Sequence, residues 1–153
     1  MIPIAEIWPS EGLDLVLAIF PKNGANAAST YLGLWGTTFT ASTVGTAANA
    51  RGSYTEVSNA GSYARVAIGS AAWQANADGG GSASEPGRKT AASQQTLQTA
   101  TAAWGTINGF FLTNTSANAA GNAYFACNFD DTTAITVNTN DIVKVTPTIE
   151  IRN

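Results

Sequence analysis

Histidine is absent from this chain of 153 residues, and cysteine occurs only once. Histidine is the usual general base near neutral pH and the commonest metal ligand, so a Ser-His-Asp triad is excluded. The single Cys127 excludes an intrachain disulfide, a thiolate zinc cluster and a redox pair. Its neighbours in 124–129 are mostly apolar, which predicts a small buried side chain. We therefore expect no catalytic residue, metal or cofactor, and a protein that is not an enzyme.

Charged side chains are also scarce, at 11% of the residues. Seven Lys and Arg stand against ten Asp and Glu, for a formal charge of -3, and the basic residues are scattered along the chain. This distribution lacks the basic patch that nucleic-acid backbones require, so we expect no nucleic-acid partner. Ala, Thr, Ser, Asn and Gly dominate instead. A surface of neutral hydroxyl and amide groups suits contact with other proteins.

Long apolar runs are missing as well. The longest candidate, 13–20, is too short to cross a bilayer, which needs about 20 apolar residues. The first residues lack a basic segment before an apolar run, so they do not predict a secretory signal. We expect a soluble protein with no membrane partner, made in the cytoplasm. Its length fits one domain.

Strand patterns account for most of what is present. Apolar spacing at 13, 16, 17 and 20 after Ser10 predicts one short N-terminal helix. Apolar and β-branched runs bounded by turn residues predict strands at 30–35, 62–69, 104–113, 122–129, 134–137 and 142–151. The last four suggest an antiparallel meander, with Pro147 at an edge or a bulge. The predicted fold is mainly β, an antiparallel β-sandwich or jelly-roll-like domain with that single helix.

The chain divides by composition into an extended N-terminal arm at 1–9 and a single β-sandwich domain at 10–153. Within the domain, Gly79, Gly80 and Gly81 and their polar neighbours predict a flexible loop at 76–88. This segment lacks the Gly-Lys step of a phosphate-binding loop. A long exposed loop on an assembling protein is suited to reach a partner.

Carboxylates offer the main alternative chemistry. Asp130 and Asp131, with Asp141, could form a calcium site or the acid and base of a glycosidase. Asp and Asn are also favoured in tight turns, and these residues fall where the strand pattern breaks, so we favour turns. A hydrolase acting through Asp130, Asp131 or Glu56 stays open, because carboxylate enzymes need no histidine. The aromatic residues could form a sugar-stacking platform, but core or interface positions are more common for them.

The apolar N-terminal helix is followed by motifs at 30–35, 55–58, 61–67, 103–107 and 121–125, and by Asn140-Asp141 before a final strand. This order of motifs resembles small virion proteins of tailed bacteriophages. Such proteins are described either as capsid decoration (cement) proteins or as short tail-fibre proteins. The resemblance transfers no catalytic residue. It implies that Arg65 is a strand residue able to pair with a carboxylate or to cap backbone carbonyls, with Trp104-Gly105 beginning a strand that packs over it.

The resemblance implies a structural protein of the virion, assembled in the host cytoplasm. Our leading hypothesis is a capsid cement subunit on the capsid surface, which binds across major capsid proteins and stabilises the shell. The alternative is a tail-fibre or baseplate component involved in host attachment. Expected partners are the major capsid protein and copies of the chain itself, as a dimer or trimer. The candidate partner contacts are Ile2, Ile4, Ile7, Trp8 and Arg65. The segment 1–9 fits equally well as an added edge strand on its own domain.

Overall fold

The fold is described from a computed structural model of the whole chain. The structure describes residues 30–36, 56–58, 60–75, 77–82, 85–118, 123–129 and 134–151, and every structural statement below concerns these residues. The predicted N-terminal helix and the arm at 1–9 lie outside them.

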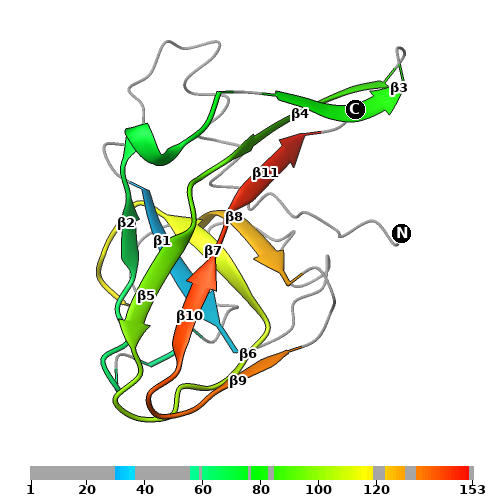
Figure 1. The fold of residues 1–153 in the computed structure, drawn as a ribbon. Helices are drawn as coiled ribbons and strands as arrows, with labels where there is room; N and C mark the ends of the chain where they lie inside the picture. The colour runs from blue at the N-terminus through cyan, green and yellow to red at the C-terminus, as the bar shows by residue number, and fades with distance from the viewer. Residues whose placement is uncertain are drawn as a thin grey trace.

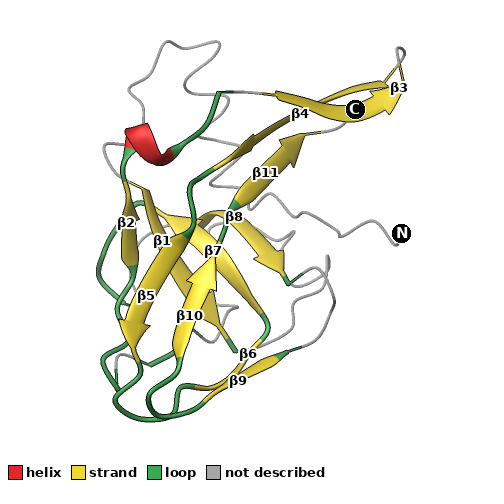
Figure 2. Cartoon of the chain, viewed as in Figure 1, coloured by secondary structure: helices red, strands yellow, loops and turns green. Residues whose placement is uncertain are grey.

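Strands make up most of the described chain, and one short 3-10 turn, Ser70–Ala72, accompanies them (Figure 2). The strands are β1 (Thr30–Trp35), β2 (Val66–Ile68), β3 (Ala77–Ser82), β4 (Glu85–Ala91), β5 (Gln95–Thr99), β6 (Gly105–Ile107), β7 (Gly109–Thr113), β8 (Ala123–Asn128), β9 (Ile135–Val137), β10 (Ile142–Val145) and β11 (Thr148–Ile151). All described strand pairs are antiparallel. The prediction of a mainly β, antiparallel fold is confirmed.

A four-stranded sheet in the order β2-β1-β7-β8 forms one layer of the body. Its two central strands are apolar on both faces, as expected of strands that are covered on both sides. In β1, Leu32 and Leu34 are fully buried, and so is Trp35 on the opposite face. Every residue of β7 is buried. The sheet therefore has one face toward the main core and a second buried face.

A second layer, made of the pairs β10-β5 and β6-β9, lies across the first face of this sheet (Figure 1). The core cluster between the layers draws Leu97 from β5, Ile107 from β6, Phe110 from β7, Phe125 from β8 and Val143 from β10. Buried and exposed residues alternate along β10, as expected for a strand with one face on a core and the other in solvent. The body is thus two packed β-layers around one core.

A three-stranded sheet, β11-β4-β3, projects from one end of the body (Figure 1). Strands β4 and β11 continue the lines of β5 and β10 beyond short breaks. Pro147, which has no N–H to donate, lies in one break, where its carbonyl accepts from the N–H of Ala92 at 2.8 Å. Where this sheet joins the body, Gln74 N–H also donates to Ala91 O at 2.8 Å. We call the sheet β11-β4-β3 the arm sheet.

Three predictions about the topology need correction. The segment 76–88 was expected to be a loop, but β3 and β4 pair there as a hairpin, because β11 supplies a second partner for β4. The expected strand 104–113 is two strands, β6 and β7, which join different sheets. The last strands do not form a meander, since β9 pairs with β6 and β10 pairs with β5. In all three cases the structure differs from the prediction because strands pair with segments that are distant in the sequence.

Candidate functional site

A buried ion pair lies at the edge of the four-stranded sheet. Arg65 and Glu56 meet in a bidentate arrangement: Nε donates to Oε1 at 2.7 Å, and Nη2 donates to Oε2 at 2.7 Å. The two side chains are 0% and 4% exposed. Such paired, short, charge-assisted bonds fix the relative orientation of two side chains. We call Glu56, Arg65 and the adjoining Tyr63 the buried triad.

Tyr63 joins this pair to the backbone of β1. Its hydroxyl donates to Glu56 Oε1 at 3.1 Å and accepts from the N–H of Leu34 at 2.8 Å. The outer edge of β1 is paired with β2 only as far as Leu32, so the hydroxyl takes the place of a missing strand partner. Burial, and next the negative charge of Glu56, raise the pKa of Tyr63 well above its usual range. The hydroxyl therefore stays protonated and can keep donating.

The remaining contacts of the triad connect separate parts of the chain. Arg65 Nη1 donates to the carbonyl of Thr115 at 2.8 Å, and the guanidinium carbon lies 5.1 Å from the ring centroid of Phe111. The backbone of Glu56 forms an isolated antiparallel β-bridge with Trp35, and Val57 N–H donates to Leu34 O at 3.1 Å. One buried cation thus ties β7 and residues 56–65 to the segment after β7.

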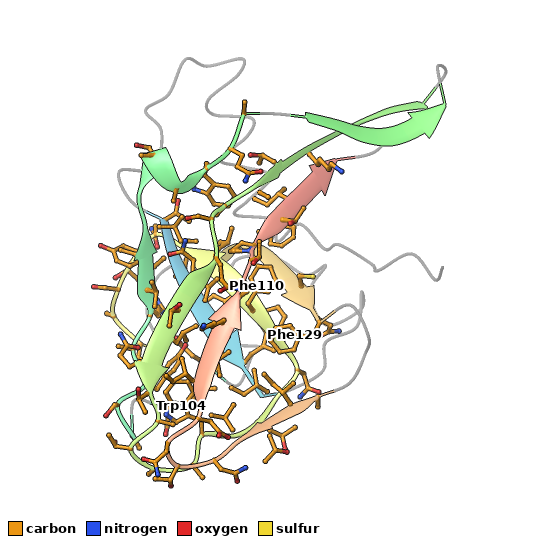
Figure 3. All side chains as sticks on the ribbon, viewed as in Figure 1. Trp104, Phe110 and Phe129 are labelled. Atoms are coloured by element: carbon orange, nitrogen blue, oxygen red, sulfur yellow. The ribbon has the colours of Figure 1, made fainter. Side chains whose placement is uncertain are left out.

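Aromatic side chains surround the triad on both faces of the sheet. On the second face, the rings of Trp35 and Phe111 are stacked, with centroids 5.9 Å apart. On the core face, the rings of Trp104 and Tyr63 pack in a T-shaped arrangement with centroids 5.4 Å apart. Trp104 Nε1 also donates to Gly61 O at 2.8 Å. Figure 3 shows Trp104 near one end of the space between the layers, with Phe110 closer to its middle. Apolar surroundings of this kind strengthen the electrostatic interactions inside the triad.

The geometry of the triad is that of a structural tie. Both oxygens of Glu56 accept hydrogen bonds from Arg65, one of them also from Tyr63, and the carboxylate is almost completely buried. A general acid or base must come within hydrogen-bond reach of a substrate. Glu56 does not present that access, so its position gives the hydrolase hypothesis no support. Asp130 and Asp131 lie outside the described residues.

Within the ranges given above, no three His, Cys, Asp or Glu side chains come together as a metal site. Among the same residues, no helix is long and apolar enough to span a membrane.

Of the predicted contact residues, the structure describes only Arg65. It is 5% exposed and forms the two kinds of bond anticipated for it, one set to a carboxylate and one to a backbone carbonyl. The strand expected to begin at Trp104-Gly105 is β6, which begins at Gly105, and Trp104 itself packs on Tyr63. Ile2, Ile4, Ile7 and Trp8 lie outside the described residues, and their role as partner contacts stays a prediction, as does that of Arg65.

The sequence did not reveal the partners of the triad. Tyr63 and Arg65 were expected within a strand at 62–69, but β2 begins only at Val66. Both are buried, Tyr63 in the main core and Arg65 against the ring of Phe111. Glu56 was considered only as a possible catalytic acid. The available signal was an Arg between small and apolar neighbours in a chain that has few charges, since such an Arg needs a carboxylate partner when it is buried.

Comparison with known proteins gives one family. No curated protein matches the chain. A family model described as "Podophage GP4 fiber I protein gp80" matches residues 23–149, which include all the described residues up to Ile149. This match covers most of the chain and agrees with the resemblance to small virion proteins of tailed phages. The chain belongs to the podophage GP4 fiber I protein gp80 family, a family of phage virion structural proteins.

Proposed function

We propose that this protein is a subunit of a podophage fibre and that it works by adhesion between protein surfaces. The single observation that carries the proposal is the family match over residues 23–149, whose description names a fibre. This supports the tail-fibre alternative over capsid cement, because nothing in the description refers to a shell. The capsid-surface location stays a prediction without support.

The buried triad supports a structural role for this part of the chain. The triad is enclosed by the protein, and Arg65 donates to Glu56 and to the carbonyl of Thr115. It holds the edge of a sheet in place, which is what a rigid module needs if it is to carry mechanical load. The two-layered body and the projecting arm sheet give such a module large β surfaces on which other subunits can pack (Figure 1).

The location can be tested on intact virions. Antibodies raised against the purified protein would be applied to phage particles, followed by gold-labelled secondary antibody and electron microscopy. We expect gold at fibres attached to the tail region. Gold distributed over the head would overturn the fibre proposal and favour the cement hypothesis.

A second experiment separates attachment to the host from a purely structural role. Purified protein would be added to host cells before infection, and the rate of phage adsorption would be measured. A fall in adsorption would place the subunit at the receptor-binding end of the fibre, whereas an unchanged rate would place it among the subunits that build the shaft or its base. Bovine serum albumin at the same concentration is the control protein.

A further inference from the structure

A short segment between β2 and β3 lies across the base of the arm sheet, where that sheet joins the body. It begins with the 3-10 turn Ser70–Ala72, which follows β2 of the four-stranded sheet, and continues through Trp73 and Gln74 toward β3. Trp73 has an extended backbone (φ -82°, ψ 130°), so the segment leaves the turn as a strand-like stretch. We call residues 70–74 the strap.

Hydrogen bonds attach the strap to the break between β4 and β5. Ser93 N–H donates to Ala72 O at 2.8 Å, and Gln74 N–H donates to Ala91 O at 2.8 Å. Thr90 Oγ1 also donates to Gln74 O at 2.9 Å. The strap therefore lies along one edge of the break, in the place that a neighbouring strand would take.

The chain between β10 and β11 holds the opposite edge of the same break. Ala92 N–H donates to Pro147 O at 2.8 Å, and Thr148 is the cross-strand partner of Ala91. On the strap side, Ala92 also forms an isolated antiparallel bridge with Trp73. The break thus has hydrogen-bonded neighbours on both edges, and turning the arm toward either edge would separate backbone groups from their partners.

Apolar packing joins the base of the arm to the main core. Ala92 is 1% exposed, and Pro147 is among the fully buried side chains. Ala72, Trp73 and Ile149 are partly buried against the core cluster. These side chains come from the strap, from the break between β4 and β5, and from the chain at β11. Because a close-packed core leaves little space for movement, the arm cannot swing without opening contacts of the body.

We propose that the strap locks the arm sheet in one direction relative to the body, so that the two move as a single rigid unit. Without the strap, the arm would continue only from β5 and β10 as a two-stranded ribbon, and such ribbons twist strongly and are marginally stable. The strap adds a connection to β2, which belongs to the other layer. The arm is therefore fixed to both layers, and the fold sets the direction in which it projects (Figure 1). The inference does not depend on the fibre proposal, because every contact that it uses lies within one chain.

Distances between pairs of spin labels, measured by double electron–electron resonance, test the lock. Cys127→Ala removes the native thiol, and Glu85→Cys with Ala67→Cys places labels at the start of β4 and at an exposed position of β2. Glu85 lies about 20 Å along β4 from Ala91, so a small rotation at the base moves its label far. The reference pair, Ala67→Cys with Lys144→Cys, joins two exposed positions within the body. We expect the arm pair to give a single distance distribution as narrow as that of the reference pair.

Two substitutions remove the lock in different ways. Trp73→Ala removes packing at the base, whereas Gln74→Pro keeps the tryptophan and removes the N–H that donates to Ala91 O. Each should widen the distribution of the arm pair at least about twofold and leave that of the reference pair unchanged. Trp104→Ala is the matched control, because Trp104 lies at the end of the body away from the arm (Figure 3), and it should change neither distribution.

Circular dichroism checks that each variant is folded. A broad distribution for the arm pair in the protein with an unsubstituted strap, beside a narrow reference, would overturn the lock. A narrow distribution for the arm pair in folded Trp73→Ala and Gln74→Pro proteins would overturn the role of the strap. Gold over the head would leave these distances unchanged, so this inference and the fibre proposal fail separately.

Discussion

At the scale of single residues, a few buried polar side chains stabilise the described part of the fold. They are easy to identify because charged residues are scarce in this chain. The described chain buries one Arg and satisfies it with one Glu, one backbone carbonyl and the face of Phe111. Removing one member of a buried ion pair leaves the other charge without compensation. The triad is therefore the place where single substitutions should have their largest effect.

Arg65→Ala should lower the free energy of unfolding by about 3–5 kcal/mol, because Glu56 would be left buried without its main donor. Urea denaturation followed by tryptophan fluorescence measures the change. Lys144→Ala is the control, since Lys144 is exposed and should change stability by less than about 0.5 kcal/mol. Equal effects of the two substitutions would contradict the structural role of the triad.

The raised pKa of Tyr63 predicts a loss of folding stability at alkaline pH. Its pKa is raised in the folded protein, so the folded state keeps the proton above pH 10, where the unfolded chain releases it. The contribution to stability is complete below about pH 10 and declines as the pH rises further, by about 1.4 kcal/mol per pH unit.

Tyr63→Phe should remove this alkaline slope while lowering stability at pH 8 by about 1–3 kcal/mol, because the N–H of Leu34 and an oxygen of Glu56 lose their hydroxyl partner. Denaturation curves between pH 8 and pH 12 for both proteins provide the comparison. The same slope in the two proteins would show that Tyr63 is not the group responsible.

Thr113 offers a stabilising substitution. It is fully buried in β7, and its Oγ1 has no hydrogen-bond partner. Thr113→Val keeps the shape and removes the unsatisfied hydroxyl, so the free energy of unfolding should rise by about 1 kcal/mol. Thr136→Val, at an exposed position in β9, should change little. A fall in stability of Thr113→Val would show that the hydroxyl has a partner.

At the scale of elements, β1 packs closely against β7 where Gly33 faces the ring of its cross-strand partner Phe111. A Cβ added to Gly33 would collide with this ring, approaching Cε1 to 2.7 Å. The ring is also stacked on Trp35 and covered by the Arg65 guanidinium, so it cannot move aside easily. Glycine is required at this position for close approach of a side chain, not for its backbone freedom.

Gly33→Ala should therefore lower the free energy of unfolding by about 1–3 kcal/mol, the range for overpacking a core. Gly69→Ala is the matched control, because an added Cβ there meets nothing within 4 Å. Thermal unfolding monitored by circular dichroism compares the two. A Gly33→Ala protein as stable as the control would mean that the Phe111 ring has room to shift.

At the scale of the whole molecule, the strand order makes most pairings non-local. β1 pairs with β7, and β5 pairs with β10, so distant segments must meet before either layer is complete. The loops that close between such partners cost conformational entropy before their contacts form. Folding should therefore be slow for a domain of this size.

We expect refolding from urea to take milliseconds to seconds, as for other antiparallel β domains. Trp35 and Trp104 lie within or beside the core, so stopped-flow fluorescence reports on its assembly. A refolding phase of full amplitude within microseconds would contradict the importance of the non-local pairs.

Local sequence patterns determined much of the secondary structure and the fold class. The sequence by itself predicted a mainly β antiparallel fold and the bounds of β1 at 30–35, because alternation and turn residues act over a few neighbours. The virion class was implied by the resemblance to small virion proteins of tailed phages, and the family match agrees with it. The resemblance also anticipated that Arg65 would need a carboxylate or carbonyl partner. It did not separate capsid cement from a fibre, because the short packing and turn motifs that carry the resemblance are not specific to one location in the virion.

Only the tertiary structure decided which strands pair and which charges meet. The segment 76–88 became the β3–β4 hairpin because β11 lies beside it, and the expected meander was wrong because β6 and β5 compete for β9 and β10. Glu56 and Arg65 are joined by the fold around Tyr63 and Leu34, and no local spacing signals that junction. Pairing across a sheet is set by burial and by the partners available, and these come from parts of the chain that are far apart in sequence.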